Sequence, residues 1–148
     1  MVKIESLMAQ GVVVARPEHS IEYVRRQMKT LDIHAVPVAD ASGAPVGLVR
    51  SRDLIEVADL EAPVESMMCR DFLALDRRVS VQQAAASMRR GRHRQVIVTE
   101  NGRIAGIVSA FDFLELLEGY RFEHREDAPD LRTGYFKIPT SLSEGEEP

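Results

Sequence analysis

The 148-residue sequence contains no tryptophan and one cysteine, Cys69, so no disulfide can form within the chain. A single cysteine also excludes a cysteine-rich metal cluster, and the four histidines show no metal-ligand spacing with one another. No apolar run approaches the roughly 20 residues that cross a bilayer, and the first residues lack the apolar core of a signal peptide. We therefore expect a cytoplasmic protein with no bound metal and no contact with a membrane.

Catalytic signatures are also missing. The sequence has no nucleophile elbow, no Walker loop and no dinucleotide fingerprint, so we expect neither an enzyme nor a catalytic cofactor. The net charge of -4 argues against binding along nucleic acid, which requires a basic surface. A hydrophobic content of 45% and a charged content of 28% are typical of an ordinary globular domain.

What the sequence does contain is an internal repeat. When Met8 is placed over Met68, the chain aligns with itself at an offset of 60, and one deletion near Ala41 changes the offset to 59. The matching pairs are Ser20 and Ser80, Met28 and Met88, Val36 and Val96, Val38 and Val98, then Gly43 and Gly102, Gly47 and Gly106, Val49 and Val108, and Asp53 and Asp112.

Each copy predicts the order strand, helix, strand, strand, helix. The apolar runs 12–15 and 72–75 open the copies, and Ser20 and Ser80 are placed as N-caps of helices with apolar residues at helical spacing. Strands follow at 34–38 and 46–49, and at 95–98 and 104–108, before second helices near 53–60 and 111–120. We expect an α/β fold of two tandem β-α-β-β-α motifs, repeat one at about 3–60 and repeat two at about 63–120, packed with pseudo-two-fold symmetry within a domain over 1–120.

Several of these segments resemble the motifs of CBS domains. They are 8–13 and 68–73 at the openings, 34–38 in the first copy and 106–112 in the second. The resemblance implies a CBS pair, or Bateman module, which binds adenosine-containing ligands in the clefts between its copies. It also implies a regulated partner protein and a disc-like homodimer; the chain carries no attached enzyme, channel or transporter.

The segment Gly106–Asp112 carries the family pattern most fully. A strand ending at Val108 and a helix beginning at Ser109 would offer free N–H groups and the Ser109 hydroxyl to a phosphate. The resemblance implies that Asp112 accepts hydrogen bonds from the ribose hydroxyls. The alternative is a capping box formed by Ser109 and Asp112 for helix stability alone, although the two roles can coexist.

The first copy departs from this pattern. It keeps Asp53 but has Arg50 where a hydroxyl is expected. Arg50 can pair with a phosphate, fill the cleft and exclude ligand, or face solvent beside a Ser51 N-cap. We therefore expect the two clefts to differ.

The resemblance also implies that each cleft is composite, with apolar residues on either side of the adenine. In one cleft Ser109 and Asp112 would face Gly11, Val13, Ile33, His34 and Ala35. In the other, Asp53 and Arg50 would face Asp71, Leu73, His93, Arg94 and Gln95. His34 and Arg94 occupy positions that often reach phosphates in the family, or else they bridge an exposed loop and a strand.

Two features lie outside this scheme. The basic run 89–94 has three interpretations. We favour solvated arginines at a helix C-terminus, then a contact to the phosphate of a small molecule, and last nucleic-acid binding. Residues 121–148 form a C-terminal extension with a disordered end, whose aromatic residues either dock on the module or belong to a loose tail.

Two functions remain: a signalling module that senses AMP, ADP, ATP or S-adenosylmethionine for a partner, or a ligand-free dimerisation scaffold.

Overall fold

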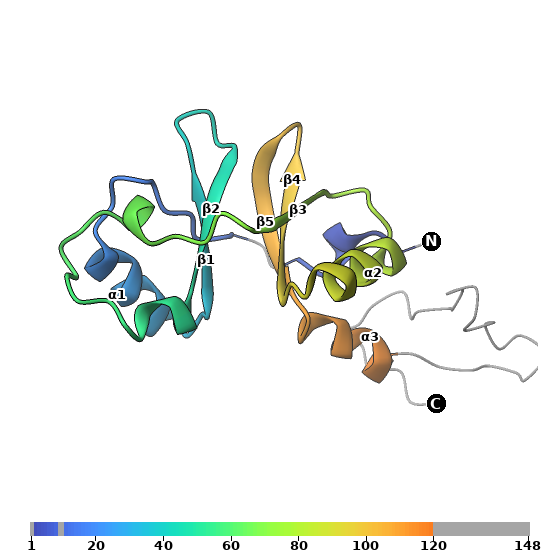
Figure 1. The fold of residues 1–148 in the computed structure, drawn as a ribbon. Helices are drawn as coiled ribbons and strands as arrows, with labels where there is room; N and C mark the ends of the chain where they lie inside the picture. Colours follow the sequence, from blue (N-terminus) through green and yellow to red (C-terminus); the bar gives the residue numbers. More distant parts are fainter. Residues whose placement is uncertain (1, 9–10, 120–148) are drawn as a thin grey trace, which may run out of the picture.

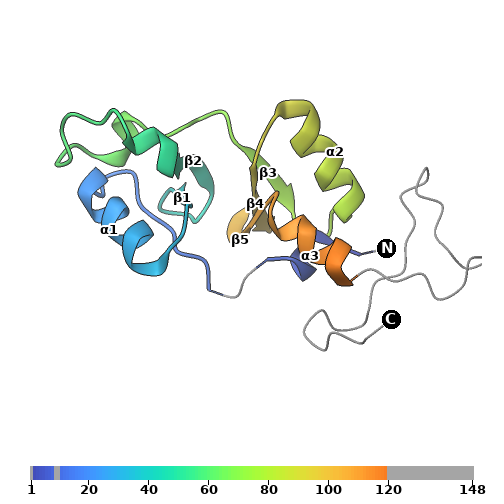
Figure 2. The ribbon, with the colours of Figure 1, turned by 90° about the horizontal axis from the view of Figure 1, so that it is seen from below.

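The computed structural model describes residues 2–8 and 11–119, so the C-terminal extension lies outside the described residues. Two similar halves meet at their sheets, and α1 and α2 lie on the outer sides (Figures 1 and 2). The elements of the first half are α1 (Ile21–Leu31), β1 (Ala35–Ala39), β2 (Pro45–Arg50) and the 3-10 helix η2 (Ser51–Leu54). Those of the second are β3 (Leu73–Asp76), α2 (Val81–Gly91), β4 (Gln95–Glu100), β5 (Arg103–Ser109) and α3 (Asp112–Gly119). The predicted α/β fold of two tandem motifs is confirmed.

The two long helices begin and end in the same way. The Ser20 hydroxyl accepts a hydrogen bond from the Tyr23 N–H at 3.1 Å, and the Ser80 hydroxyl accepts one from the Gln83 N–H at 3.2 Å. Both helices end at a residue with left-handed backbone, Asp32 with φ 52° and Arg92 with φ 58°. The predicted N-caps are confirmed. After each helix a short turn leads into the next strand, β1 or β4.

The opening strands of the two copies differ. In the second copy β3 pairs in parallel with β4, whereas the predicted strand 12–15 is reduced to one parallel bridge between Ala15 and Val38. In the second copy the Arg77 N–H donates to the Thr99 carbonyl at 2.8 Å and extends the ladder. Pro17 stands at the equivalent position of the first copy, and Pro37 of β1 stands at the position of Ile97. Neither proline has an N–H to donate, so the parallel pairing stops on both sides of Ala15.

The closing helices differ as well. The prediction of a helix near 53–60 is wrong, because only η2 forms before the chain continues in turns to Leu60. Ile55 and Val57 follow η2, and β-branched side chains are poor helix formers. In the second copy the leucine-rich segment that follows Phe113 forms α3.

The opening segments of the copies cross over. The 3-10 helix η1 (Ile4–Ser6) packs in the core of the second copy, and η3 (Val64–Ser66) packs in the core of the first. The sulfur of Met8 lies against Gly106, and the sulfur of Met68 lies against Gly47, where a Cβ atom would collide with it. Each copy therefore completes the core of the other.

Candidate functional site

Two clefts lie between the copies, and both take residues from each copy. The first, which we call the Asp112 cleft, has a volume of about 450 Å³. Its lining residues are Gly11, Val12, Val13, Leu31, Asp32, Ile33, His34, Ala35, Gln95, Ile107, Ser109 and Asp112. All seven residues expected to surround this cleft, Ser109 and Asp112 included, are therefore brought together.

The lining of the Asp112 cleft combines apolar residues with the polar residues Asp32, His34, Gln95, Ser109 and Asp112. The side chains of Val12, Val13 and Ile33 come from the first copy, and that of Ile107 comes from β5 of the second. The carboxylate of Asp112 and the hydroxyl of Ser109 lie where β5 passes into α3. Cavities of this size with few polar anchors are typical of small-molecule sites.

Ser109 and Asp112 form the predicted capping box. The Ser109 N–H donates to Asp112 Oδ2 at 2.7 Å, and the Asp112 N–H donates to Ser109 Oγ at 3.3 Å. The other oxygen, Oδ1, accepts no hydrogen bond from the part of the chain that the structure describes. Capping thus uses Oδ2 of Asp112 and leaves Oδ1 available to a ligand.

The prediction of a helix beginning at Ser109 is wrong, and of the amides at 109–112 only the Phe111 N–H has no acceptor within the described part of the chain. Because Ser109 pairs with Gln95 at the end of the ladder, β5 continues through Ser109 and α3 begins only at Asp112. The Ala110 N–H donates to the Arg94 carbonyl at 2.7 Å, so the amides of Ser109, Ala110 and Asp112 all have protein acceptors. A phosphate near this turn would have to be bound chiefly by side chains.

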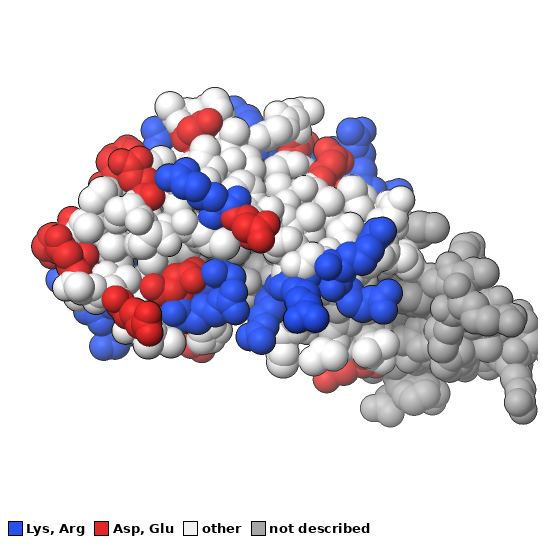
Figure 3. Space-filling view, viewed as in Figure 1, with Lys and Arg blue, Asp and Glu red and all other residues white. Residues whose placement is uncertain are grey.

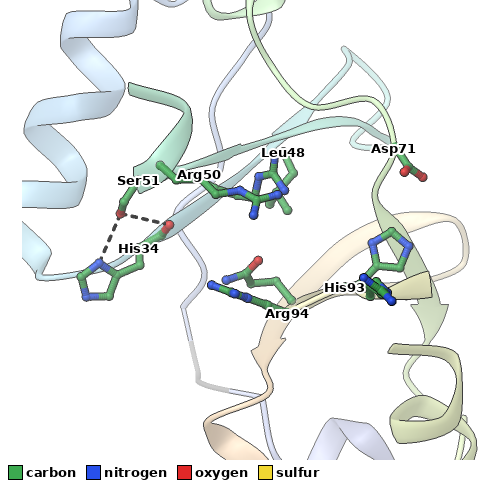
Figure 4. A pocket seen from close by; sticks show the side chains of 10 residues that line it. His34, Leu48, Arg50, Ser51, Asp71, His93 and Arg94 are labelled. Carbon is green, nitrogen blue, oxygen red and sulfur yellow. Dashed lines mark hydrogen bonds between the residues drawn. The ribbon is translucent and has the colours of Figure 1, made fainter. Parts of the chain in front are cut away.

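The second cleft, which we call the Arg50 cleft, has a volume of about 200 Å³ (Figure 4). Its lining residues are His34, Leu48, Arg50, Ser51, Arg52, Asp71, Arg92, His93, Arg94 and Gln95. Five of the seven residues expected there are present. Asp53 and Leu73 do not line it, and the half-buried Leu73 packs against the core of the second copy instead.

The carboxylate of Asp53 is occupied by Arg50. The Arg50 Nε donates to Oδ2 at 2.9 Å and Nη2 donates to Oδ1 at 2.8 Å, while the Arg50 N–H also donates to Oδ2 at 2.9 Å. Burial raises the pKa of Asp53, but the hydrogen bonds from Arg50 outweigh burial and hold the pKa below its ordinary value. The hydrogen bond to Asp53 in turn raises the pKa of Arg50.

This pairing decides between two of the arrangements considered for Arg50. The solvent-facing alternative is wrong, because the side chain is only 23% exposed and points to its own Asp53. Arg50 and Arg94 approach the cavity from opposite copies (Figure 4). Arg50 therefore occupies space in this cleft and removes the carboxylate that would hold a ribose.

His34 and Gln95 line both clefts and so mark their boundary. The His34 Nδ1 lies 3.2 Å from Ser51 Oγ, and the His34 carbonyl accepts a hydrogen bond from the Ser51 N–H at 2.9 Å. The Arg94 carbonyl accepts the equivalent bond from Ala110 in the second copy. His34 and Arg94, the residues predicted to reach phosphates, thus lie at equivalent places in the two copies. In each copy the loop after the long helix contacts the turn after the last strand.

The sequence profile of the CBS domain matches this chain twice, at residues 4–59 and 64–119. The chain belongs to the CBS domain family. CBS domain pairs are generally regulatory modules without catalysis of their own. Within the described residues, no group of three His, Cys, Asp or Glu side chains could hold a metal ion. No helix of that same portion is long and apolar enough to cross a membrane.

Three similar proteins place this CBS pair among known ones. The CBS domain pair of protein MJ0100, in complex with 5'-methylthioadenosine and S-adenosyl-L-methionine, has a TM-score of 0.73 at 22% identity and covers 80% of this chain and 98% of that one. A CBS domain protein from Pyrobaculum aerophilum complexed with AMP has a TM-score of 0.69 at 22% identity, over 75% and 89% of the two chains. The inosine-5'-monophosphate dehydrogenase of Korarchaeum cryptofilum is 29% identical over 133 residues, which are 89% of this chain and 28% of that enzyme. The CBS pair thus spans little more than a quarter of that enzyme's length.

Some lining residues of this CBS pair were not anticipated. The Arg50 cleft also contains Leu48, Ser51, Arg52 and Arg92, and the Asp112 cleft also contains Val12, Leu31, Asp32 and Ile107. Most are chain neighbours of predicted residues. The basic run 89–94 was the sequence signal for Arg92. Its predicted position at a helix end is confirmed, because α2 ends at Gly91. Arg92 has left-handed backbone, and Arg92, His93 and Arg94 line the cleft.

Proposed function

We propose that this CBS pair is a sensory module that binds one adenosine-containing ligand in the Asp112 cleft and thereby regulates a partner protein. The supporting observation is the composition of that cleft. Seven residues expected from the sequence surround a cavity of about 450 Å³, with an available carboxylate oxygen in its lining.

The chemistry of the cleft suits a nucleoside. The apolar side chains of Val13, Ile33 and Ile107 provide flat contact surface for an adenine ring, and backbone groups of residues 33–35 can read its edge. Asp112 lines the cleft, and its Oδ1 would accept hydrogen bonds from ribose hydroxyls. AMP, ADP and ATP are the proposed ligands, with S-adenosylmethionine as a further candidate.

Ligand binding would act on the angle between the copies. The cleft takes Gly11 and residues 31–35 from the first copy and residues 107–112 from the second, so a bound ligand contacts both. A ligand that fits one relative orientation better than another shifts the population toward it. That change is the signal that we propose a partner reads.

We also propose that the module forms a homodimer through α3 and the residue just before it. Phe111 is 75% exposed and Leu117 is 70% exposed, with Leu114 between them. Apolar side chains this exposed and this near in the chain are typical of an interaction surface. Light scattering on the intact protein measures the oligomeric state directly.

A thermal-shift titration with adenosine, the adenine nucleotides and S-adenosylmethionine tests ligand binding. A ligand at about 100 times its Kd stabilises the folded state by about 2.7 kcal/mol. We expect a shift in the wild type and its loss in Asp112→Ala, each variant being compared with its own ligand-free Tm because Asp112 also caps α3. Glu115→Ala, at an exposed position of the same helix, is the matched control. A wild type that fails to respond at millimolar ligand would favour the ligand-free scaffold.

A further inference from the structure

The Arg50 cleft has a different chemistry from its neighbour. Four of its lining residues are arginines, and Asp71 is the one acidic residue among the described residues that line it. Figure 3 shows lysine and arginine side chains gathered along the junction of the two copies on this side of the molecule.

Three of these arginines are unpaired within residues 2–8 and 11–119. The guanidinium groups of Arg52, Arg92 and Arg94 take part in no hydrogen bond or ion pair there, whereas Arg50 is neutralised by Asp53. Like charges around one cavity repel each other, and a bound anion removes that repulsion. Arginine guanidinium groups bind phosphate through two parallel hydrogen bonds.

The same cleft is unsuited to a nucleoside. Its volume of about 200 Å³ is less than half that of the Asp112 cleft, and small-molecule pockets usually measure about 300–1,000 Å³. Leu48 is the one apolar side chain of substantial size in its described lining, so an adenine ring would find little contact surface. Both oxygens of Asp53 are held by Arg50, so no carboxylate is available for a ribose.

The basic surface continues beyond the cleft. A second hollow of about 690 Å³ shares Arg52, Arg92 and Arg94 with it and adds Arg89 at the end of α2. The side chains of Arg52, Arg92 and Arg94 therefore line both hollows. This arrangement fits an elongated anion with several charges better than it fits a single compact one.

We propose that the Arg50 cleft binds a phosphate chain and not a second nucleoside. The chain can be a free oligophosphate, or it can be the phosphate tail of a nucleotide whose adenosine occupies the Asp112 cleft. The two clefts adjoin at His34 and Gln95, which permits the second source. The free-anion case stands alone, whereas the nucleotide case rests on the proposed function.

Isothermal titration of the intact protein with sodium tripolyphosphate, at constant ionic strength, tests the free anion. We expect Arg92→Gln and Arg94→Gln each to weaken binding about tenfold or more, because each removes charge-assisted hydrogen bonds to phosphate. Both side chains are exposed, so the variants should fold, and circular dichroism checks this. Arg90→Gln is the matched control: Arg90 lies on α2 and donates to the Ala86 carbonyl, but it lines neither hollow.

Titration with adenosine and ATP tests the nucleotide tail. If the phosphates of ATP reach the Arg50 cleft, ATP binds more tightly than adenosine, and Arg94→Gln reduces this ratio about tenfold without changing the affinity for adenosine. The proposal is overturned if the arginine variants change neither tripolyphosphate binding nor the ratio of ATP to adenosine affinity. Adenosine binding without an arginine-dependent phosphate effect would contradict the phosphate site and leave the proposed function intact. Arginine-dependent tripolyphosphate binding without adenosine binding would support the phosphate site and contradict the proposed function.

Discussion

Replacing Arg50 by serine should turn the Arg50 cleft into a second nucleoside site, weaker than the Asp112 cleft because Leu48 stays the one apolar side chain of substantial size in its described lining. The substitution removes the guanidinium from the Arg50 cleft and releases both oxygens of Asp53, which it now holds at 2.8 and 2.9 Å. The introduced serine would occupy the position equivalent to Ser109 of the second copy. The backbone N–H at this position can then keep its bond to Asp53 and leave the other oxygen for a ribose. The first copy would thus have the same capping box as the second.

The cost to stability should be small. The Arg50 and Asp53 side chains are 23% and 16% exposed, so their ion pair is only partly shielded from water. Charge-assisted hydrogen bonds at such positions contribute about 1–2 kcal/mol once the lost hydration is counted. Urea unfolding should detect a loss of that size and show that the variant remains folded.

Calorimetric titration with adenosine measures the outcome. We expect one site per chain in the wild type and two in Arg50→Ser, and no second site in the control Arg52→Ser, which removes a charge from the same cleft without releasing Asp53. If Arg50→Ser still binds one adenosine per chain at the wild-type affinity, the argument that Arg50 and its ion pair keep nucleosides out is refuted.

Other contacts lead to three further predictions. Since Arg50 holds the pKa of Asp53 below its ordinary value of 3.8, that carboxylate stabilises the fold above 3.8 and the contribution is lost as pH falls through the lowered value. The urea midpoint should therefore fall more steeply between about pH 5 and pH 3 in the wild type than in Arg50→Ser. Glu22, whose pKa is about 2, is present in both proteins and cancels in the difference; equal slopes would contradict the assignment. Gly106→Ala should destabilise by about 1–3 kcal/mol in chemical denaturation, because its Cβ meets the sulfur of Met8, and Met8→Ala should relieve much of that loss in a double-mutant cycle. Additive effects would show that the contact is not the cause. Finally, tripolyphosphate should weaken AMP binding more than adenosine binding, because only AMP brings a second anion to the boundary at His34 and Gln95. AMP should weaken tripolyphosphate binding by the same factor. Calorimetric titrations of each ligand in the presence of the other measure both factors, and an AMP affinity that does not change with tripolyphosphate would show that the two clefts are not coupled.

The repeat made much of the fold predictable. Ser20 and Ser80 cap their helices because capping depends on a few neighbouring residues, which the sequence displays directly. The shortened strand before Pro17 and the missing helix after η2 were not predicted, because both copies were expected to behave alike. In each place one copy has lost a local requirement: the N–H groups missing at Pro17 and Pro37, and helix-forming side chains at Ile55 and Val57.

The site was predictable to a similar extent. The lining of the Asp112 cleft follows from the order of the elements, because loops at equivalent positions of two packed copies must meet. The state of Asp53 could not be predicted, because three arrangements were open to Arg50: pairing with a phosphate, filling the cleft or facing solvent. Pairing with Asp53 itself was not anticipated. Only the geometry of η2, which brings Asp53 within 2.9 Å of both the backbone and the side chain of Arg50, reveals this pairing.

The different states of Asp53 and Asp112 can therefore be traced to one pair of equivalent positions, Arg50 and Ser109. In both copies the aspartate three residues later bonds to the backbone N–H of this position, so the turn is built in the same way. A hydroxyl at this position leaves one carboxylate oxygen available and the cavity open, whereas a guanidinium takes the second oxygen and fills the cavity with donors. Because the turn does not depend on the side chain, the position is free to determine ligand chemistry without disturbing the fold. Two copies that share a core, a capping pattern and a crossed opening segment can therefore leave one aspartate oxygen available in one cleft and none in the other, while Arg52, Arg92 and Arg94 supply the remaining positive charge of the Arg50 cleft.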